Sequence, residues 1–272
     1  LLLGRGEPPR PLAKRTETTM YAIGVLGVAI MWVLIQYQSV VGWLMLVCGA
    51  ALLLYVLVEA FKLEKPPRER MFAILFLIAL QPLFWGLFEQ AGGSLNLFTD
   101  RYIDRQGVPA SLFQSINPIY IILLAPVFAG LWTWLGRRGL EPSTPAKFGL
   151  GLVQLGFGFL VLVWGAATVS PEALIPVVFL FGIYLFHTTG ELCLSPVGLS
   201  AMNRLAPKHL ASLIMGAWFF ATAGGNFVAG LIGAATGGED GEMTREGTLA
   251  VYQQIGWVAI VVGIVVIVIA RF

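Results

Sequence analysis

Eight stretches of about 20 mostly apolar residues follow one another along this chain, and they constrain its fold more than any other feature. A helix needs about 20 apolar residues to cross the hydrocarbon of a bilayer. Only 12% of the 272 residues are charged and 57% are hydrophobic, whereas an average soluble domain is about 25% charged. We therefore predict an all-α membrane protein of about eight transmembrane helices. The stretches lie near residues 20–38, 41–61, 71–97, 117–136, 148–168, 174–202, 210–236 and 251–270.

The distribution of basic residues predicts the orientation of these spans. If residues 1–19 lie in the cytoplasm, alternate crossing places 14 of the 17 Lys and Arg on the cytoplasmic side. The other side then holds only Arg101, Arg105 and Arg245. Cytoplasmic loops are generally enriched in Lys and Arg, so the asymmetry supports both the orientation and the number of spans. A net charge of +2, spread over short loops, gives no indication of a nucleic-acid partner.

The first 19 residues predict a cytoplasmic linker. They lack an initiator Met and the residue order of a signal peptide, so we expect the sequence to be part of a longer chain, cut after an upstream span. A short turn at Gln36–Ser39 predicts a two-helix hairpin over residues 20–62. Cys48 and Cys193 lie far apart in apolar stretches, and they indicate neither a disulfide nor a zinc site.

Two carboxylates at bilayer depth, Glu89 and Glu191, are the strongest indication of function. A charge at mid-bilayer costs about 2.5–3.5 kcal/mol on insertion scales, and such residues usually line a water-filled cavity or a proton path. The sequence that follows Glu89, Gln90–Ser94, contains two glycines and weakens the helix. Trp85 lies one turn before Glu89 on the same helix face, as either a cavity-wall aromatic or an interfacial one.

Glu191 belongs to a polar stripe. His187, Glu191 and Ser195 recur every four residues, so they share one helix face. Pro196 removes a backbone donor and is expected to bend or open the helix. Because no third ligand cluster accompanies His187 and Glu191, the pair is a poor metal site. The simplest interpretation of His187 is a structural histidine.

Two further segments contain candidate binding residues. Asn117 stands at the start of the fourth span, where an asparagine could equally be a helix N-cap or a ligand-binding residue. In the seventh span Gly225, Ala229 and Gly233 recur every four residues, which favours close helix packing. Packing alone explains the glycines, but it explains the bulky pair Trp218 and Phe219 less well.

Several of these segments together resemble the proton-dependent oligopeptide transporter family of the major facilitator superfamily. The matching segments are FWGLFEQAGGSLNL, SINPIYIILLAPVFAGLW and TTGELCLSPVGLSAMNRLAPKHLASLIMGAWFFATAGGNFVAG, with the two-helix insertion before them. The resemblance covers nearly the whole chain. It implies that residues 63–272 form the family's C-terminal six-helix bundle and that residues 20–62 are the hairpin found in bacterial members. The N-terminal bundle of the family, with its acidic motif and basic partners, is absent from this sequence.

The resemblance also implies roles for matching residues. Glu89 matches an acid that pairs with a basic group across the cavity and couples the gate to protonation. Glu191 matches the acid that receives the α-amino group of the peptide, with Ser195 beside it. The other matches are Asn117 to a peptide-contacting asparagine, Trp85 to a cavity wall, and Trp218 and Phe219 to a side-chain pocket and inner gate.

The sequence therefore predicts the C-terminal half of a proton-coupled symporter for di- and tripeptides in a bacterial inner membrane. We expect no cofactor apart from the coupling proton. The expected partners are the peptide, the lipid bilayer and the N-terminal bundle. One alternative is transport of another small solute such as nitrate, although Glu191 would repel an anion. A remote alternative is an intramembrane enzyme that uses His187 and Glu191, but no nucleophile or metal set accompanies them.

Overall fold

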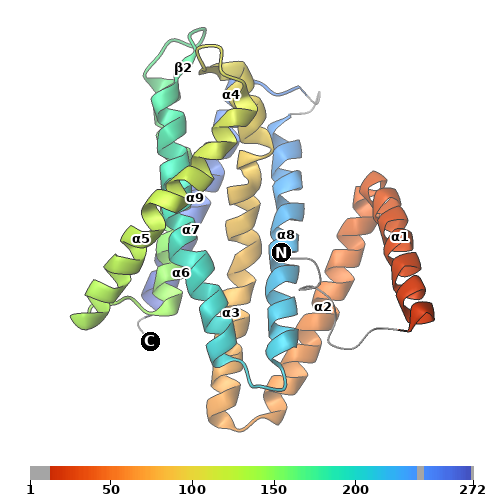
Figure 1. Cartoon of the computed structure of the whole chain (residues 1–272). Coiled ribbons are helices and arrows are strands. Elements are labelled where there is room, and N and C mark those ends of the chain that lie inside the picture. The colour runs from red at the N-terminus through yellow and green to blue at the C-terminus, as the bar shows by residue number, and fades with distance from the viewer. Residues whose placement is uncertain (1–12, 238–241, 271–272) are drawn as a thin grey trace, which may run out of the picture. The chain divides into compact units, whose positions relative to one another are not determined.

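The computed structural model describes residues 13–237 and 242–270, and this part of the chain is almost entirely helical (Figure 1). Its long helices are α1 (Lys14–Gln36), α2 (Gln38–Lys62), α3 (Lys65–Phe88), α4 (Ser94–Tyr102), α5 (Ile116–Arg137), α6 (Thr144–Ala167), α7 (Val177–Leu205), α8 (Ala211–Thr236) and α9 (Arg245–Ile269). The short elements are the 3-10 helices η1 (Glu89–Ala91) and η2 (Ala110–Ser115) and the strands β1 (Ile103–Asp104) and β2 (Ile175–Pro176).

These elements supply eight helical segments that are long and apolar enough to cross a membrane, within the described residues. The third segment consists of α3, η1 and α4 together, because the helix is interrupted after Phe88 without ending the span. The predicted all-α fold with eight spans is therefore confirmed. The observed helices extend a few residues beyond the apolar stretches, since polar residues at the membrane surface can continue a helix.

The chain divides into two compact units, residues 1–53 and 54–272. The first unit contains α1 and most of α2. No described residue of α1 is buried within this unit. Tyr37 alone separates α1 from α2. In the first turns of α1, the hydroxyls of Thr18 and Thr19 donate to the carbonyls of Lys14 and Arg15, one turn earlier.

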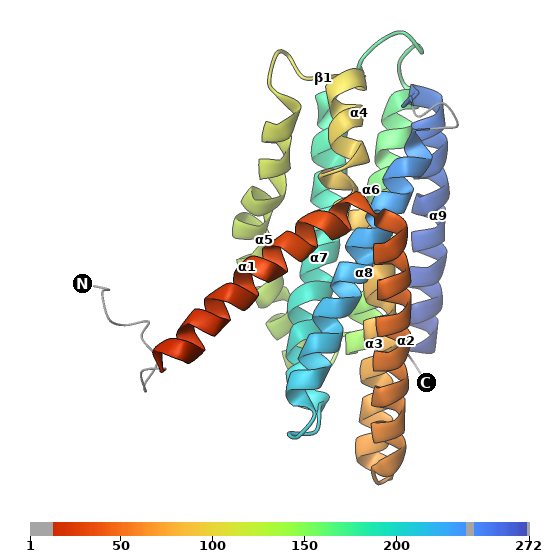
Figure 2. The same cartoon turned by 90° about the vertical axis from the view of Figure 1, so that its right-hand side faces the viewer.

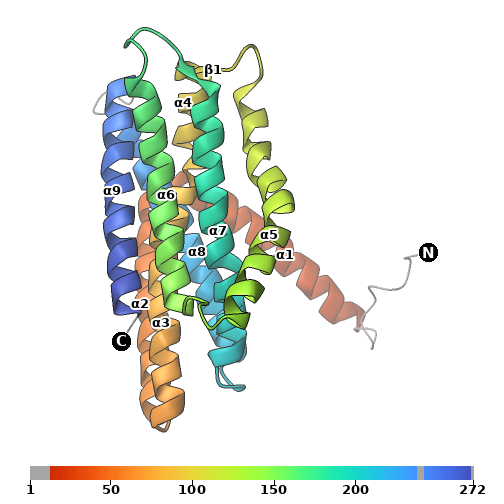
Figure 3. The ribbon, with the colours of Figure 1, turned by 90° about the vertical axis from the view of Figure 1, so that its left-hand side faces the viewer.

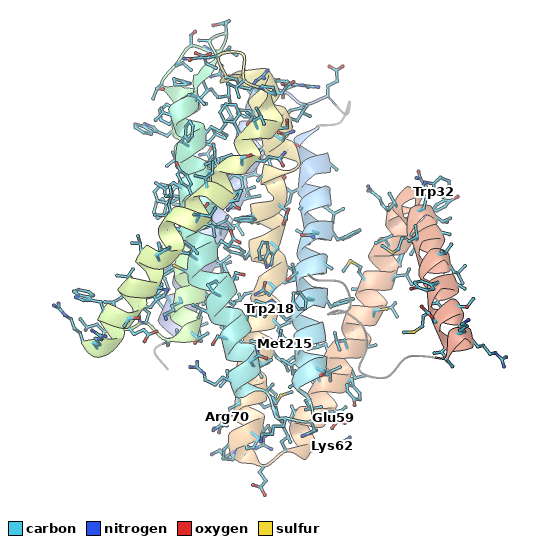
Figure 4. All side chains as sticks on the ribbon, in the orientation of Figure 1. Trp32, Glu59, Lys62, Arg70, Met215 and Trp218 are labelled. Carbon is cyan, nitrogen blue, oxygen red and sulfur yellow. The ribbon has the colours of Figure 1, made fainter. Side chains whose placement is uncertain are left out.

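The second unit is a bundle whose connections gather at two opposite ends (Figures 2 and 3). The connections from α4 to α5 and from α6 to α7 lie at one end, where β1 and β2 form a short parallel pair. The turns from α5 to α6 and from α7 to α8 lie at the other end. Glu59, Lys62 and Arg70 also gather there, with Lys62 donating to Glu59 over 2.7 Å (Figure 4). This alternation is what consecutive membrane crossings require.

Glycines allow α6 to pack very closely on α9. A methyl group added at Gly263 would lie 2.6 Å from the carbonyl oxygen of Gly149 and 2.7 Å from the side chain of Val153. On its other side α6 approaches α7, where a methyl group at Gly190 would lie 2.7 Å from the oxygen of Gly151. These contacts are too short for any side chain, so the three backbones form the tightly packed part of the core.

Helix α5 is packed in a different way. It runs at an angle across the bundle, whereas α6, α7 and α9 run nearly side by side (Figures 1 and 3). Ile116, in its first turn, is the one buried residue of this helix, while twelve residues of α6 are buried. Its contacts with the rest of the unit are mainly to α7 and η2. This loose arrangement leaves space beside α7.

Candidate functional site

Helix α7 presents Glu191 and Ser195 toward that space. Both side chains are partly exposed and line a cavity between α5, the start of α6 and α7. The i, i+4 spacing of the two residues places them one above the other on one face. The helix is not interrupted at Pro196, which lies inside α7 and lines the same cavity. The expected opening of the helix at Pro196 is therefore not observed.

His187, the third member of the predicted polar stripe, lies away from the cavity. Its side chain is 1% exposed, and its ring contacts Phe159 at a centroid distance of 4.8 Å and Phe88 at 6.0 Å. Neither ring nitrogen has a hydrogen-bond partner among the described residues. The residue packs against the backbone of α6 at Gly158. This position fits the structural interpretation of His187.

Asn117 connects α5 to Glu191. Its Nδ2 donates to Glu191 Oε2 and to Thr188 Oγ1, both over 3.1 Å. The side chain does not cap α5, because Asn117 lies in the first turn and Ser115 occupies the N-cap position. Asn117 therefore brings α5 to α7 at the level of the carboxylate.

Thr188 determines which end of the Asn117 amide faces Glu191. The hydroxyl of Thr188 donates its hydrogen to Tyr184 O over 2.7 Å, so toward Asn117 its oxygen can only accept. Asn117 must therefore turn its NH₂ group, and not its oxygen, toward Thr188. The second hydrogen of that group then points at Glu191. An ionised carboxylate is an acceptor only, and this arrangement supplies it with one donor.

The cavity beside Glu191 has a volume of about 830 Å³. Along its length it is mainly apolar, and charged residues stand at its ends. Glu191 lies at one end; Glu141, Lys147 and Arg204 lie toward the other. The remaining lining residues come from one face of α5, from the start of α6 and from α7, and are Ile121, Ala125, Phe128, Ala129, Trp132, Pro142, Ser143, Thr144, Leu192, Ser195, Pro196, Val197, Leu199 and Ser200.

Lys147 closes the far end of the cavity. Its side chain is 7% exposed, and its Nζ donates to Glu141 Oε1 over 2.5 Å. The ammonium group also lies 4.3 Å from the centroid of the Trp132 ring, within the range of a cation–π interaction. A buried charge requires such compensation. The cluster joins the end of α5 to the start of α6.

Glu89 is the first residue after α3 and belongs to η1. Its side chain is partly exposed, and no basic residue lies within ion-pair distance of it in the described part of the chain. The Gln90–Ser94 segment does interrupt the helix, as its glycines predict.

A buried hydrogen-bond network supports the interruption after Glu89. Gln90 Nε2 donates to Gly86 O over 2.9 Å and to Ala229 O of α8 over 3.1 Å. Ser94 Oγ donates to Gln90 Oε1 over 2.6 Å and lies 2.8 Å from the hydroxyl of Tyr252 on α9. Polar groups at membrane depth need such partners. Glu89 is thus held at a fixed point of the span.

Trp85 lies one turn before Glu89, and its indole N–H already has a hydrogen-bond partner. Its indole N–H donates to Gln81 Oε1 over 2.5 Å, and its ring packs edge-on against Phe84 and Phe88. The backbone at Trp85 also contacts Gly225 of α8. Trp85 does not line the cavity beside Glu191.

Trp218 and Phe219 have opposite environments. Trp218, which is labelled in Figure 4, is 4% exposed. It packs against Gly198 of α7 and the ring of Phe148. Phe219, the next residue of α8, is 60% exposed. Neither side chain lines the cavity. Within the predicted glycine ridge, Gly225 contacts α3, whereas nothing lies within 4 Å of a side chain added at Gly233.

The structure adds residues to this site that sequence reasoning did not single out. These are Thr188, the Lys147–Glu141 pair and the α5 face that lines the cavity. The helical spacing of Ile121, Ala125, Phe128 and Trp132 is a usable signal for that face. Thr188 gives no such signal, since a threonine inside a span usually bonds only to its own helix. Within the described residues, no group of three His, Cys, Asp or Glu side chains could hold a metal ion.

Comparison with known proteins identifies the family. Residues 34–248 match the sequence profile of the POT family. The chain belongs to the POT family. It is 35% identical over 240 residues to the peptide transporter YePEPT of Yersinia enterocolitica, a match that covers 82% of this chain and 47% of the relative. It is 30% identical over 236 residues to dipeptide and tripeptide permease A of Edwardsiella piscicida, with coverages of 85% and 48%.

A solved structure supports the same conclusion. A crystal structure of the peptide transporter POT, a point variant in complex with alafosfalin, superposes on 99% of this chain with a TM-score of 0.77 and 31% identity, and the match covers 55% of that protein. The chain spans about half the length of these relatives. These matches confirm the predicted family membership. POT-family transporters are membrane proteins that carry peptides, and they are not enzymes.

Proposed function

We propose that this chain forms the peptide-binding C-terminal half of a proton-coupled symporter for di- and tripeptides in a bacterial inner membrane. In this proposal, residues 63–272 are the six-helix bundle and residues 20–62 the hairpin before it. An N-terminal bundle faces the bundle across the transport pathway, and the two rock against each other to give alternating access. We call the combination of this chain with such a bundle the assembled transporter.

The observation that carries the proposal is the environment of Glu191. This carboxylate lies inside a span, faces a cavity, and receives one hydrogen bond from Asn117. No basic residue within the described residues is near enough to form an ion pair with it. A half-buried carboxylate with one donor can accept further hydrogen bonds, and the α-ammonium group of a peptide supplies both the charge and the donors.

Glu89 has a separate proposed role in proton coupling. Its carboxylate lacks a basic partner within the part of the chain that the structure describes, so we assign it a partner on the N-terminal bundle. Protonation of Glu89 and its ion pair with that partner are mutually exclusive. Loss of the ion pair on protonation would then release the two bundles.

The remaining predicted residues have supporting roles in this proposal. Asn117 orients the Glu191 carboxylate, and Ser195 lies one turn farther along the cavity wall. Trp85 and Trp218 do not line the cavity. They support the site by packing within the bundle, on α3 and α8. Phe219 is exposed enough to contact a gate or a substrate.

Transport of a small anion such as nitrate is the competing function. It requires a cationic or neutral site. Lys147 and Arg204 line the far end of the cavity, but the end at which α5 and α7 meet through Asn117 presents the Glu191 carboxylate. A panel of anions tested against dipeptides as competitors of uptake would separate the two functions. We expect competition by dipeptides only.

Replacement of Glu191 tests the proposal directly. In the assembled transporter, Glu191→Gln removes the charge but keeps the shape, so proton-driven dipeptide uptake should lose at least about tenfold in apparent affinity, the usual value of a charge-assisted hydrogen bond. Glu172→Gln, at an exposed residue of the loop before β2, is the matched control and should leave uptake unchanged. Unaltered uptake by the Glu191→Gln variant would contradict the proposed amine anchor.

A further inference from the structure

The end of the cavity away from Glu191 carries more hydrogen-bond donors than the described part of the chain uses. The side chain of Lys147 is 7% exposed and donates to Glu141, although an ammonium group has three donors. The indole Nε1 of Trp132, which also lines the cavity, is buried and has no hydrogen-bond partner among the described residues. A buried donor without a partner costs free energy. This end of the cavity is therefore suited to an additional acceptor.

Arg204 adds a second positive charge to the same end. It lines the cavity from α7 and is exposed, and it forms no ion pair with any described residue. Lys147 and Arg204 together carry two positive charges, whereas Glu141 carries one negative charge. The three side chains leave one positive charge without a counter-charge, which a singly charged anion would neutralise.

The packing of α6 on α7 directs the two basic side chains toward each other. A methyl group added at Gly198 would lie 2.7 Å from the ring of Phe148, so the first turns of α6 lie beside the last turns of α7. Side chains on a helix lean toward its N-terminus. Lys147 therefore leans toward the start of α6, and Arg204 leans back toward Ser200, one turn earlier. Because the two helices run in opposite directions (Figure 3), both cations approach the start of α6.

The start of α6 adds further donors. Ser143 and Thr144 line the cavity there, and Ser143 is the N-cap residue of α6. Ser200 of α7 adds a third hydroxyl group to the lining. The first N–H groups of a helix have no acceptor within the helix, and the positive end of its dipole favours an anion. Phosphate groups are bound by this combination of a helix N-terminus and basic side chains.

We propose that the end of the cavity between Lys147, Arg204 and the start of α6 binds one phosphate group. A phosphodiester carries a single negative charge, which balances the one positive charge left at this end. The phosphate belongs either to free inorganic phosphate or to the headgroup of an anionic phospholipid, since basic pockets between transmembrane helices bind such headgroups. The proposal does not depend on the role of Glu191.

A bound phosphate would join three helices. Trp132 belongs to α5, Lys147 to α6 and Arg204 to α7. Helix α5 otherwise contacts the rest of the unit mainly through α7 and η2. Occupation of the site should therefore stabilise the folded bundle, because a ligand that binds only the folded state raises its stability by mass action.

Thermal denaturation of the purified protein in detergent tests the site with inorganic phosphate as the probe. When phosphate replaces chloride at constant pH and ionic strength, the melting temperature should rise and then saturate. Arg204→Gln should weaken the apparent affinity for phosphate by about tenfold or more, the usual value of a charge-assisted hydrogen bond. Arg138→Gln is the matched control and should keep the response, since the Arg138 guanidinium lies on the ring of Trp134 and does not line the cavity.

Trp132→Phe tests the site from α5. This variant keeps an aromatic face for the ammonium of Lys147 and removes only the indole N–H, so the bundle should fold. Its affinity for phosphate should also fall. An unchanged affinity would overturn the assignment of the Trp132 N–H to the site.

A lipid probe distinguishes the two sources of phosphate. Phosphatidylglycerol is added in mixed micelles, with phosphatidylcholine as the control, because the choline group cancels the charge of its phosphate. A rise of the melting temperature with inorganic phosphate alone would assign free phosphate, and a larger rise with phosphatidylglycerol than with phosphatidylcholine would assign the headgroup. The proposal is overturned if neither probe raises the melting temperature, or if Arg204→Gln and Arg138→Gln respond alike.

Discussion

The α6–α9 and α5–α7 contacts are two opposite ways of joining membrane helices. At the first, Gly149 and Gly263 allow the backbones to approach so closely that no side chain fits between them. At the second, a cavity separates the helices, and polar groups join α5 to its neighbours at its two ends. In lipid, close packing supplies most of the attraction between helices. The first contact is therefore suited to a rigid support and the second to ligand binding.

The largest effect should come from breaking the close contact. Gly263→Ala places a methyl group 2.6 Å from the oxygen of Gly149, and overpacking of this kind costs about 1–3 kcal/mol. Gly130→Ala is the matched control on α5, where nothing lies within 4 Å of the added methyl group. Thermal denaturation of the purified protein in detergent should show a clear loss of stability for Gly263→Ala only. If the two variants had equal melting temperatures, the α6–α9 contact would not be packed more tightly than the surroundings of α5.

A smaller effect should come from the end of α5 near Lys147. Glu141→Gln removes the carboxylate and leaves the ammonium of Lys147 buried against Trp132. Loss of one partner of a fully buried pair costs about 3–5 kcal/mol, but Glu141 is 44% exposed, so we expect about 1–2 kcal/mol. In the control, Glu69→Gln, the ion pair with Lys65 is exposed and 3.9 Å long, and such pairs contribute little.

Thermal denaturation of both variants measures this difference. If Glu141→Gln loses no more stability than Glu69→Gln, the Lys147 cluster does not hold α5 in place.

The smallest effect should come from the other end of α5. Thr188→Val removes the acceptor for Asn117, at a cost of about 1 kcal/mol. The same substitution in an Asn117→Ala background should cost only what the loss of the Thr188 bond to Tyr184 O costs, because the interaction with Asn117 is already absent. Thr188→Ser should restore the stability of the original protein. Thr189→Val is the control, since the Thr189 hydroxyl bonds only within α7. Additive effects of Thr188→Val and Asn117→Ala would contradict the proposed coupling.

The sequence predicts most of the fold, because the length and spacing of apolar stretches in a membrane follow from the thickness of the bilayer. It also predicts the interruption after Glu89, since the Gln90–Ser94 segment carries two adjacent glycines. The glycine ridge of α8 is predicted in part: Gly225 contacts α3, whereas nothing among the described residues lies within 4 Å of a methyl group added at Gly233. Periodicity identifies a small-residue face and does not determine how far along the helix its partner extends.

The site is less predictable than the fold. The i, i+4 spacing places His187 and Glu191 on one face, yet His187 packs against Phe159 while Glu191 lines a cavity. A face of a helix is wide enough to contact both a neighbouring helix and a cavity. The burial of Trp218 likewise depends on Gly198, which lies on a different helix. Such pairings depend on tertiary packing, which a pattern in one segment does not contain.

The interruption after Glu89 has a mechanical consequence for the bundle. Gln90 and Ser94 connect the broken span to α8 through Ala229 and to α9 through Tyr252. The break is therefore held rigid and is not a hinge, because bending there would break the buried hydrogen bonds that join the interrupted span to α8 and α9. The bundle should move around Glu89 as one body, so that a change in the carboxylate's charge is transmitted to the whole bundle and not absorbed by a local bend.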